Sequence, residues 1–192
     1  MSGQRTGDAP LTASKRQDAV EEAAGTVAGN GGDTLTGWSV TINRPAAELF
    51  AFFRNFANLP QIMDNIERID VLDEHRSHWV VKAPGGTSVE WTSAITAEKQ
   101  DSFIAWASEK GADVSNSGRV DFRPAGDRGT VVTATILYDP PLGAAGKLIA
   151  KLFQRDPTIQ ARRDLRRFKQ LMETGEIATA ARTKKQLEEE KA

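Results

Sequence analysis

The sequence predicts one α+β domain, in which a curved antiparallel sheet of about seven strands is wrapped on a long C-terminal helix. Three observations predict this class. A strand-like segment is followed by two short helical segments, six strand-like segments then follow with short connections, and a long amphipathic segment ends the folded part. Because a sheet has one apolar face to cover, the closing helix is expected to cover it.

The first predicted strand precedes the two short helices. Trp38-Ser-Val-Thr-Ile42 alternates apolar and polar side chains with a period of two, as a half-buried strand does. Pro45 suits the first turn of a helix, and Phe50 and Phe53 follow at a spacing that puts them on one helical face. A second short helix is expected at residues 58–65.

Six further strands are predicted from alternating β-branched or aromatic residues. They are expected at residues 66–72, 78–82, 87–96, 103–107, 117–123 and 130–138. The connectors contain Gly, Pro, Asp and Ser, which are typical of turns. Strands joined by such short connectors indicate an antiparallel meander.

The long helix is predicted from residue 148 to about residue 173, with Pro157 bending or restarting it. Its apolar stripe consists of Leu148, Ile149, Leu152, Phe153, Ala161, Leu165, Phe168 and Met172. The opposite arc is basic and carries Arg162, Arg163, Arg166, Arg167 and Lys169. Residues 142–173 contain eight basic and three acidic side chains, a net charge of +5 in a chain whose total is −1.

Composition limits the other possibilities. Residues 1–36 are rich in Ala, Gly, Thr and Asp and are expected to form a disordered tail, followed by the folded domain at 37–175 and a charged extension at 176–192. The chain has no cysteine, which excludes disulfides and thiolate chemistry. No secretory signal and no apolar run of about 18 residues is visible, so the cytoplasm is the expected location.

Several phrases carry a resemblance to a known family. They include Phe56-Ala-Asn-Leu-Pro-Gln-Ile-Met63, Val89-Glu-Trp91, Ile104-Ala-Trp106, Gly118-Arg-Val-Asp-Phe122 and Leu165-Arg-Arg-Phe-Lys-Gln-Leu-Met-Glu-Thr-Gly175. From about residue 38 to 175 the chain resembles the polyketide cyclase/dehydrase branch of the SRPBCC superfamily, which also includes START lipid-transfer domains and the birch-pollen-allergen fold. The resemblance implies a helix-grip fold with a cavity between the sheet and the long helix for an apolar molecule.

Members of that superfamily are variously cyclases, lipid or quinone carriers, and proteins of unknown role. Three functions therefore remain open for this chain. The first is binding or carrying a small hydrophobic ligand such as a lipid, a quinone or a polyketide-like aromatic. The second is a cyclase or dehydratase acting on such a ligand, and the third is a protein- or membrane-interaction module that uses the basic arc of the long helix.

The predicted ligand-binding residues are apolar or aromatic and share strand parity or helix face with the expected pocket. They are Phe53, Met63, Trp79, Val81, Trp91, Ile95, Trp106, Val120, Phe122, Ile136, Tyr138, Leu148, Leu152, Leu165 and Phe168. Antiparallel sheets usually fill one face only, so tryptophans on several strands favour a lined pocket. The alternative is that these side chains form plain core.

Catalysis would need a general acid or base inside the pocket. Tyr138, the single tyrosine, is the one candidate, and its alternative role is that of a tyrosine at the edge of the core. His75 and His78 flank a predicted turn, which is too flexible to hold a metal ion. Glu90 and Asp121 alternate with apolar neighbours and are expected to face solvent. No metal and no cofactor is predicted.

The basic arc on the long helix has two interpretations. Cations near a helix C-terminus complement the helix dipole, and a solvated helix face often carries them. The arc would also suit an anionic membrane surface, where each Lys or Arg contributes about 1 kcal/mol. No nucleic-acid-reading motif accompanies the charge, so nucleic acid is not predicted as a partner. The oligomeric state is left open.

Overall fold

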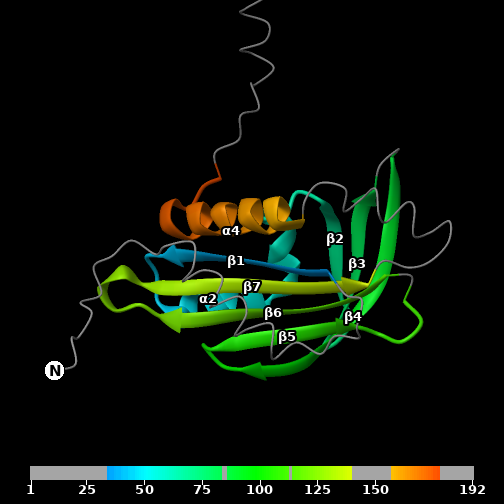
Figure 1. Cartoon of the computed structure of the whole chain (residues 1–192), viewed down its shortest axis with the longest axis horizontal. Helices are drawn as coiled ribbons and strands as arrows, with labels where there is room; N and C mark the ends of the chain where they lie inside the picture. Colours follow the sequence, from blue (N-terminus) through cyan, green and yellow to red (C-terminus); the bar gives the residue numbers. More distant parts are fainter. Residues whose placement is uncertain (1–33, 84–85, 113, 140–156, 178–192) are drawn as a thin grey trace, which may run out of the picture.

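The computed structural model describes residues 34–83, 86–112, 114–139 and 157–177 (Figure 1). The elements follow in the order β1 (Thr34–Ile42), α2 (Ala46–Arg54), the 3-10 helix η1 (Phe56–Gln61), β2 (Ile66–Val71), β3 (Arg76–Ala83), β4 (Thr87–Lys99), β5 (Phe103–Ser108), β6 (Ser115–Pro124), the 3-10 turn η2 (Gly126–Arg128), β7 (Thr130–Asp139) and α4 (Pro157–Thr174). The predicted order of strand, two short helices, six strands and one long helix is confirmed.

The seven strands form one antiparallel sheet in the order β1-β7-β6-β5-β4-β3-β2. Strands β2 to β7 make the predicted meander, and β1 joins it by pairing with β7. Irregular register between Ile95 and Ala97 in β4 and between Ile66 and Arg68 in β2 marks bulges, which bend a strand and increase its twist. The sheet curls, α4 packs on it, and the α+β helix-grip fold is confirmed (Figure 1).

The first strand begins earlier than predicted. β1 starts at Thr34, which pairs with Tyr138 of β7, so residues 34–36 belong to the sheet and not to a disordered tail. The main-chain hydrogen bonds of an antiparallel ladder do not depend on side-chain hydrophobicity. The composition of residues 34–36 therefore does not predict this pairing, which depends on the partner strand β7.

The second short helix also differs from its prediction. The structure has a 3-10 helix at Phe56–Gln61 in place of an α-helix at 58–65. Pro60 inside this segment has no N–H to donate, and the main-chain N–H of Ile62 bonds to Leu59 O at 3.0 Å before the chain turns into β2. The predicted long helix is present as α4 from Pro157 onward, and its part at 148–156 lies outside the described residues.

The core forms where α2 and α4 meet over the concave face of the sheet. Phe168 of α4 is fully buried, and its ring centroid lies 5.3 Å from that of Phe52 and 6.0 Å from that of Phe53, both in α2. Phe53 in turn contacts Phe122 of β6. α4 runs along β1 (Figure 1), whereas η1 packs on β2 at the other end of the sheet and its Phe56 contacts Trp79 of β3 edge-to-face.

Candidate functional site

A cleft of about 660 Å³ opens between α2 and the sheet, beside the turns that join β2 to β3 and β4 to β5. Small-molecule pockets typically have volumes of about 300–1,000 Å³. We call it the α2 cleft, and its lining consists of Ala47, Phe50, Ala51, Arg54, Asn55, Phe56, Val71, Asp73, Glu74, His75, Arg76, Ser77, Ile95, Glu98, Gln100 and Asp101. Its helical wall is α2, and no residue of α4 lines it.

The interior of the α2 cleft is apolar. Phe50 is half-buried on the helical wall and meets Phe122 edge-to-face, with ring centroids 5.8 Å apart. On the sheet side Ile95 is half-buried, whereas Val71 is 56% exposed.

Arg54 spans the mouth of the cleft. Its Nε donates to Glu98 Oε2 at the end of β4 at 2.5 Å, and its Nη2 donates to the main-chain oxygen of Glu74 at 2.9 Å. These contacts connect α2 to both turns that border the cleft. Because the ion pair is partly exposed, we assign it a positioning role and not a large stabilising energy.

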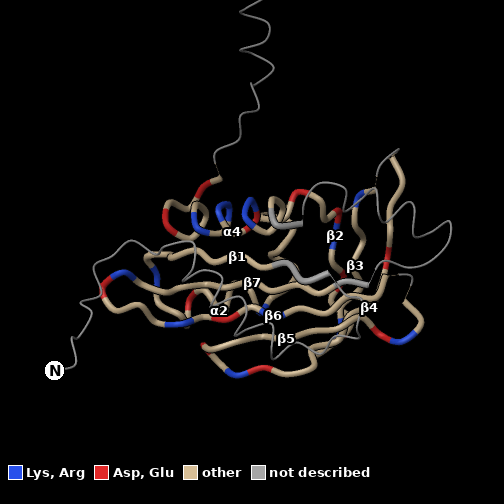
Figure 2. Tube along the Cα trace, in the orientation of Figure 1, with Lys and Arg blue, Asp and Glu red and all other residues tan. Residues whose placement is uncertain are grey.

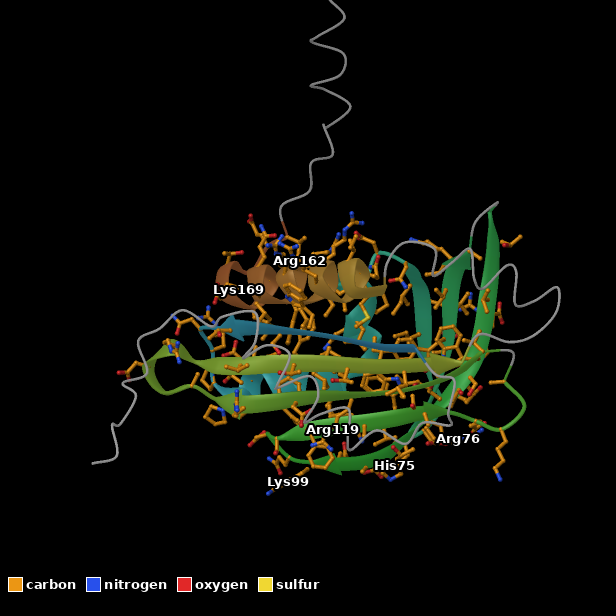
Figure 3. All side chains as sticks on the ribbon, viewed as in Figure 1. His75, Arg76, Lys99, Arg119, Arg162 and Lys169 are labelled. Carbon is orange, nitrogen blue, oxygen red and sulfur yellow. The ribbon has the colours of Figure 1, made fainter. Side chains whose placement is uncertain are left out.

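The turn between β2 and β3 forms the rest of the mouth. Asp73 Oδ1 accepts main-chain hydrogen bonds from His75 at 2.9 Å and from Arg76 at 2.8 Å. The bond from His75, followed by that from Arg76, stabilises the carboxylate and lowers the pKa of Asp73. Arg76 also donates to Glu109 at 2.6 Å. The mouth, marked by His75 and Arg76 in Figure 3, lies on the side opposite Arg162 and Lys169 of α4.

Two stacked tryptophans lie beyond the cleft on the concave face. Trp79 and Trp91 pair across β3 and β4, with ring centroids 6.2 Å apart and an interplanar angle of 10°. The indole Nε1 of Trp79 donates to Ser77 Oγ at 2.9 Å, and that of Trp91 donates to Ser93 Oγ at 3.1 Å. Each indole is therefore held by a serine two residues away on the same face.

Trp106, the tryptophan of β5, lies over a glycine of the neighbouring strand. Trp106 of β5 pairs with Gly118 of β6, and a Cβ atom placed on Gly118 would lie 2.3 Å from Trp106 Cζ2. The absence of a side chain at Gly118 therefore lets the indole of Trp106 lie flat against the neighbouring strand.

We expect Gly118→Ala to displace the Trp106 indole from the concave face. Overpacking of this kind costs about 1–3 kcal/mol of unfolding free energy, measurable by urea denaturation. Trp106→Phe removes the overlapping ring atoms, so in that background Gly118→Ala should cost clearly less. Equal costs in the two backgrounds would contradict the contact.

The predicted ligand-binding residues gather on the concave face and on the helix faces that meet it. Those in the buried core are Phe53, Trp79, Val81, Val120, Phe122, Leu165 and Phe168. Those that are half-buried are Met63, Trp91, Ile95, Trp106 and Ile136. Ile95 lines the α2 cleft. Leu148, Leu152 and the side chain of Tyr138 lie outside what the structure describes.

Sequence analysis missed the helical wall of the α2 cleft. Ala47 and Ala51 are one helical turn apart in α2 and are exposed, while Leu49 and Phe53 of the same helix are buried. Small residues at i and i+4 beside an aromatic residue could have indicated a face that leaves room for a ligand. Their short side chains carry no hydrophobic signal strong enough to stand out.

The two histidines have different surroundings. His75 lines the mouth of the α2 cleft, whereas His78 points to Thr92 and Glu90 on β4, at 3.3 Å each. Glu90 is exposed as predicted, and Asp121 is half-buried beside Arg119. Within residues 34–83, 86–112, 114–139 and 157–177 no cluster of His, Asp and Glu suitable for a metal ion occurs.

Figure 2 shows basic positions along α4, and several of these side chains make contacts within the chain. Arg167 pairs with Asp64, Lys169 Nζ donates to Glu173 and to Thr41 O, and the guanidinium of Arg162 lies 5.1 Å from the ring centroid of Trp38. Arg163 and Arg166 are exposed. Three of the five predicted contact residues thus help to attach α4 to the domain.

Asp164 is a buried carboxyl that sequence analysis placed on neither face of the long helix. It is 9% exposed and lies on the face of α4 that also carries Ala161, Leu165 and Phe168. Its Oδ1 accepts a hydrogen bond from Gln160 Nε2 at 2.8 Å. Burial of the carboxylate raises the pKa of Asp164 to about 7, although that hydrogen bond opposes the change. Its neighbours Arg162, Arg163, Arg166 and Arg167 suggest a charged surface, so the sequence gives no signal of this burial.

The curled sheet and the helices over its concave face define a helix-grip domain, and a cleft of about 660 Å³ lies between the sheet and α2. Residues 38–173 match the model of the family described as "Polyketide cyclase / dehydrase and lipid transport". The chain belongs to this family, and the resemblance predicted from its sequence is confirmed. Among the described residues no helix is long and apolar enough to cross a membrane.

This chain is similar to the following three proteins. A curated relative is the uncharacterised 17.2 kDa protein of the melC2-rnhH intergenic region of Streptomyces lincolnensis, 28% identical over 136 residues, which cover 70% of this chain and 87% of that protein. The crystal structure of DR_A0006 from Deinococcus radiodurans is 39% identical, with a TM-score of 0.61 over 74% of this chain and 100% of that one. The ZhuI aromatase/cyclase from Streptomyces sp. R1128 is similar in fold, with 14% identity and a TM-score of 0.59 over 76% and 99% of the two chains.

Proposed function

We propose that this protein binds or carries a small hydrophobic molecule, such as a lipid, a quinone or a polyketide-like aromatic, on the concave face of its sheet. The observation that carries the proposal is the α2 cleft, about 660 Å³ in volume, which has an apolar interior and a polar mouth. Small-molecule sites typically combine apolar walls with polar groups that orient the ligand. The ligand enters at the mouth beside Arg54 and extends along the sheet toward Trp91 and Trp106.

The energetics suit a carrier. Burying about 300 Å² of apolar ligand surface contributes roughly 7 kcal/mol at about 25 cal/mol per Å². A net gain of that size would correspond to a dissociation constant of about 10 μM. The loss of translational and rotational freedom offsets part of the gain and makes binding weaker than this. Such an affinity permits both loading and release, and binding alone needs no catalytic group.

We expect Ala51→Trp to weaken binding of the neutral dye N-phenyl-1-naphthylamine by at least about tenfold, measured by fluorescence titration. Ala51 lines the cleft from α2, so an indole at this position occupies the space that the dye needs. Tenfold weaker binding corresponds to about 1.4 kcal/mol, a modest fraction of the apolar gain.

The matched control is Ala57→Trp, which introduces the same indole at an exposed position of η1 outside the cleft. This variant should bind the dye as the unmodified protein does. Equal binding by all three proteins would place the ligand elsewhere, and no binding by the unmodified protein would overturn the proposal.

A further inference from the structure

Four polar residues cross the concave face in one line. Ser77 of β3 pairs with Ser93 of β4, and Ser93 pairs with Ser108 of β5. The main-chain N–H of Asn116 in β6 donates to Ser108 Oγ at 3.0 Å, which continues the line to a fourth strand. Ser77 also lines the α2 cleft, so this polar row begins at the cleft and continues across the sheet beyond the residues that line it.

The three serines of the polar row each accept a hydrogen bond and keep a proton to donate. Ser77 and Ser93 accept from the indoles of Trp79 and Trp91, and Ser108 accepts from the main chain of Asn116. A hydroxyl carries one donor beside its acceptor lone pairs. Among the described residues no contact uses these hydroxyl protons, so each serine can still donate a hydrogen bond to a ligand.

Asn116 supplies one more donor at the inner end of the row. Its side-chain Nδ2 is buried and has no hydrogen-bond partner among the described residues, although the residue as a whole is half-buried. A buried donor without a partner costs about 1–3 kcal/mol, and an unplaced water or ligand commonly explains it. An acceptor atom brought by a ligand would satisfy this amide.

Apolar side chains flank the polar row on both sides. Trp91 lies two residues before Ser93 on β4 and Ile95 two residues after it, and all three share the concave face. On β5, Trp106 likewise lies two residues before Ser108 and shares its face. A flat apolar molecule therefore meets uncharged donors between hydrophobic surfaces.

Resting on the proposed function, we infer that the ligand carries a neutral acceptor oxygen, as in a ketone or quinone, and that Asn116 Nδ2 with the Ser108 hydroxyl binds it. The groups of the row are uncharged, so they complement a carbonyl oxygen, while a pure hydrocarbon would leave the buried amide unpaired. Recognition of a ligand oxygen by otherwise unpaired polar groups is a strong source of selectivity.

The test compares 9-fluorenone with fluorene, which share a ring skeleton and differ at the carbonyl. Binding is measured by quenching of tryptophan fluorescence. The unmodified protein should bind fluorenone about tenfold more tightly than fluorene, as one to two hydrogen bonds supply. Asn116→Leu and Asn116→Asp both remove the amide donor, so each should lose this preference while fluorene binding is kept.

Ser115→Ala is the matched control, because Ser115 is exposed and precedes Asn116 on the other face of β6. It should keep the tenfold preference. Equal affinity of the unmodified protein for both probes would overturn the inference and leave the proposed function standing. Binding of neither probe would overturn both. If the Asn116 variants lose binding of fluorenone and of fluorene to the same extent, Asn116 has a structural role and does not recognise the carbonyl oxygen.

Discussion

Asp164→Asn should stabilise the protein at pH 8 by up to about 4 kcal/mol and hardly at all at pH 3. The pKa of Asp164 is about 7 in the folded chain against a reference value of 3.8, and each unit corresponds to about 1.36 kcal/mol. Burial on the inner face of α4 is the main cause. Asparagine keeps an oxygen that can accept the bond from Gln160 Nε2 and removes the ionisable group.

The pH dependence follows from the direction of that change. Below about pH 3.8 the carboxyl is protonated in both states, so the full stability is present. As the pH rises toward 7 the unfolded chain releases the proton and the folded chain keeps it, so the free energy of unfolding falls. Between pH 5 and 8 this group alone should lower it by about 2–3 kcal/mol.

The measurement is urea denaturation at pH 5 and pH 8 for the unmodified protein and for Asp164→Asn. Asp127→Asn is the control, because Asp127 is exposed in η2 and its replacement should change stability by less than about 0.5 kcal/mol. If the advantage of Asp164→Asn does not grow from pH 5 to pH 8, the buried carboxyl does not have the raised pKa.

Phe168→Ala should lower the free energy of unfolding by about 3–5 kcal/mol. The Phe168 ring is 0% exposed and contacts Phe52 and Phe53, so its removal leaves a cavity at the junction of α2 and α4. Since Phe53 also contacts Phe122, the loss reaches the sheet. α4 would lose its largest inward side chain.

Chemical denaturation monitored by far-ultraviolet circular dichroism measures this loss. Phe103→Ala is the matched control, because Phe103 is half-buried under the guanidinium of Arg119, 3.7 Å from its ring centroid. Its cost should be clearly smaller, since a half-exposed ring leaves no closed cavity. Equal costs for the two variants would mean that Phe168 does not anchor α4.

Much of the architecture could be predicted from local patterns. The alternation of Val120 and Phe122 and the stripe of Ala161, Leu165 and Phe168 each identified the buried face, because strand and helix periodicities are properties of the local chain. The exact start of β1 at Thr34 could not be predicted, because it depends on pairing with Tyr138, about a hundred residues away in the chain. Asp164 could not be recognised either, because its burial depends on how α4 packs on the domain.

Taken alone, the sequence determined the α+β class, the strand order along the chain, the family resemblance and the set of aromatic residues that meet on the concave face. Tertiary structure decided where space is left between them. Phe168 packs against Phe52 and Phe53, while Ala47 and Ala51 leave the opposite end of the concave face open as the α2 cleft. A cleft is the volume that side chains from distant segments do not fill, so the local periodicity of the sequence does not predict it.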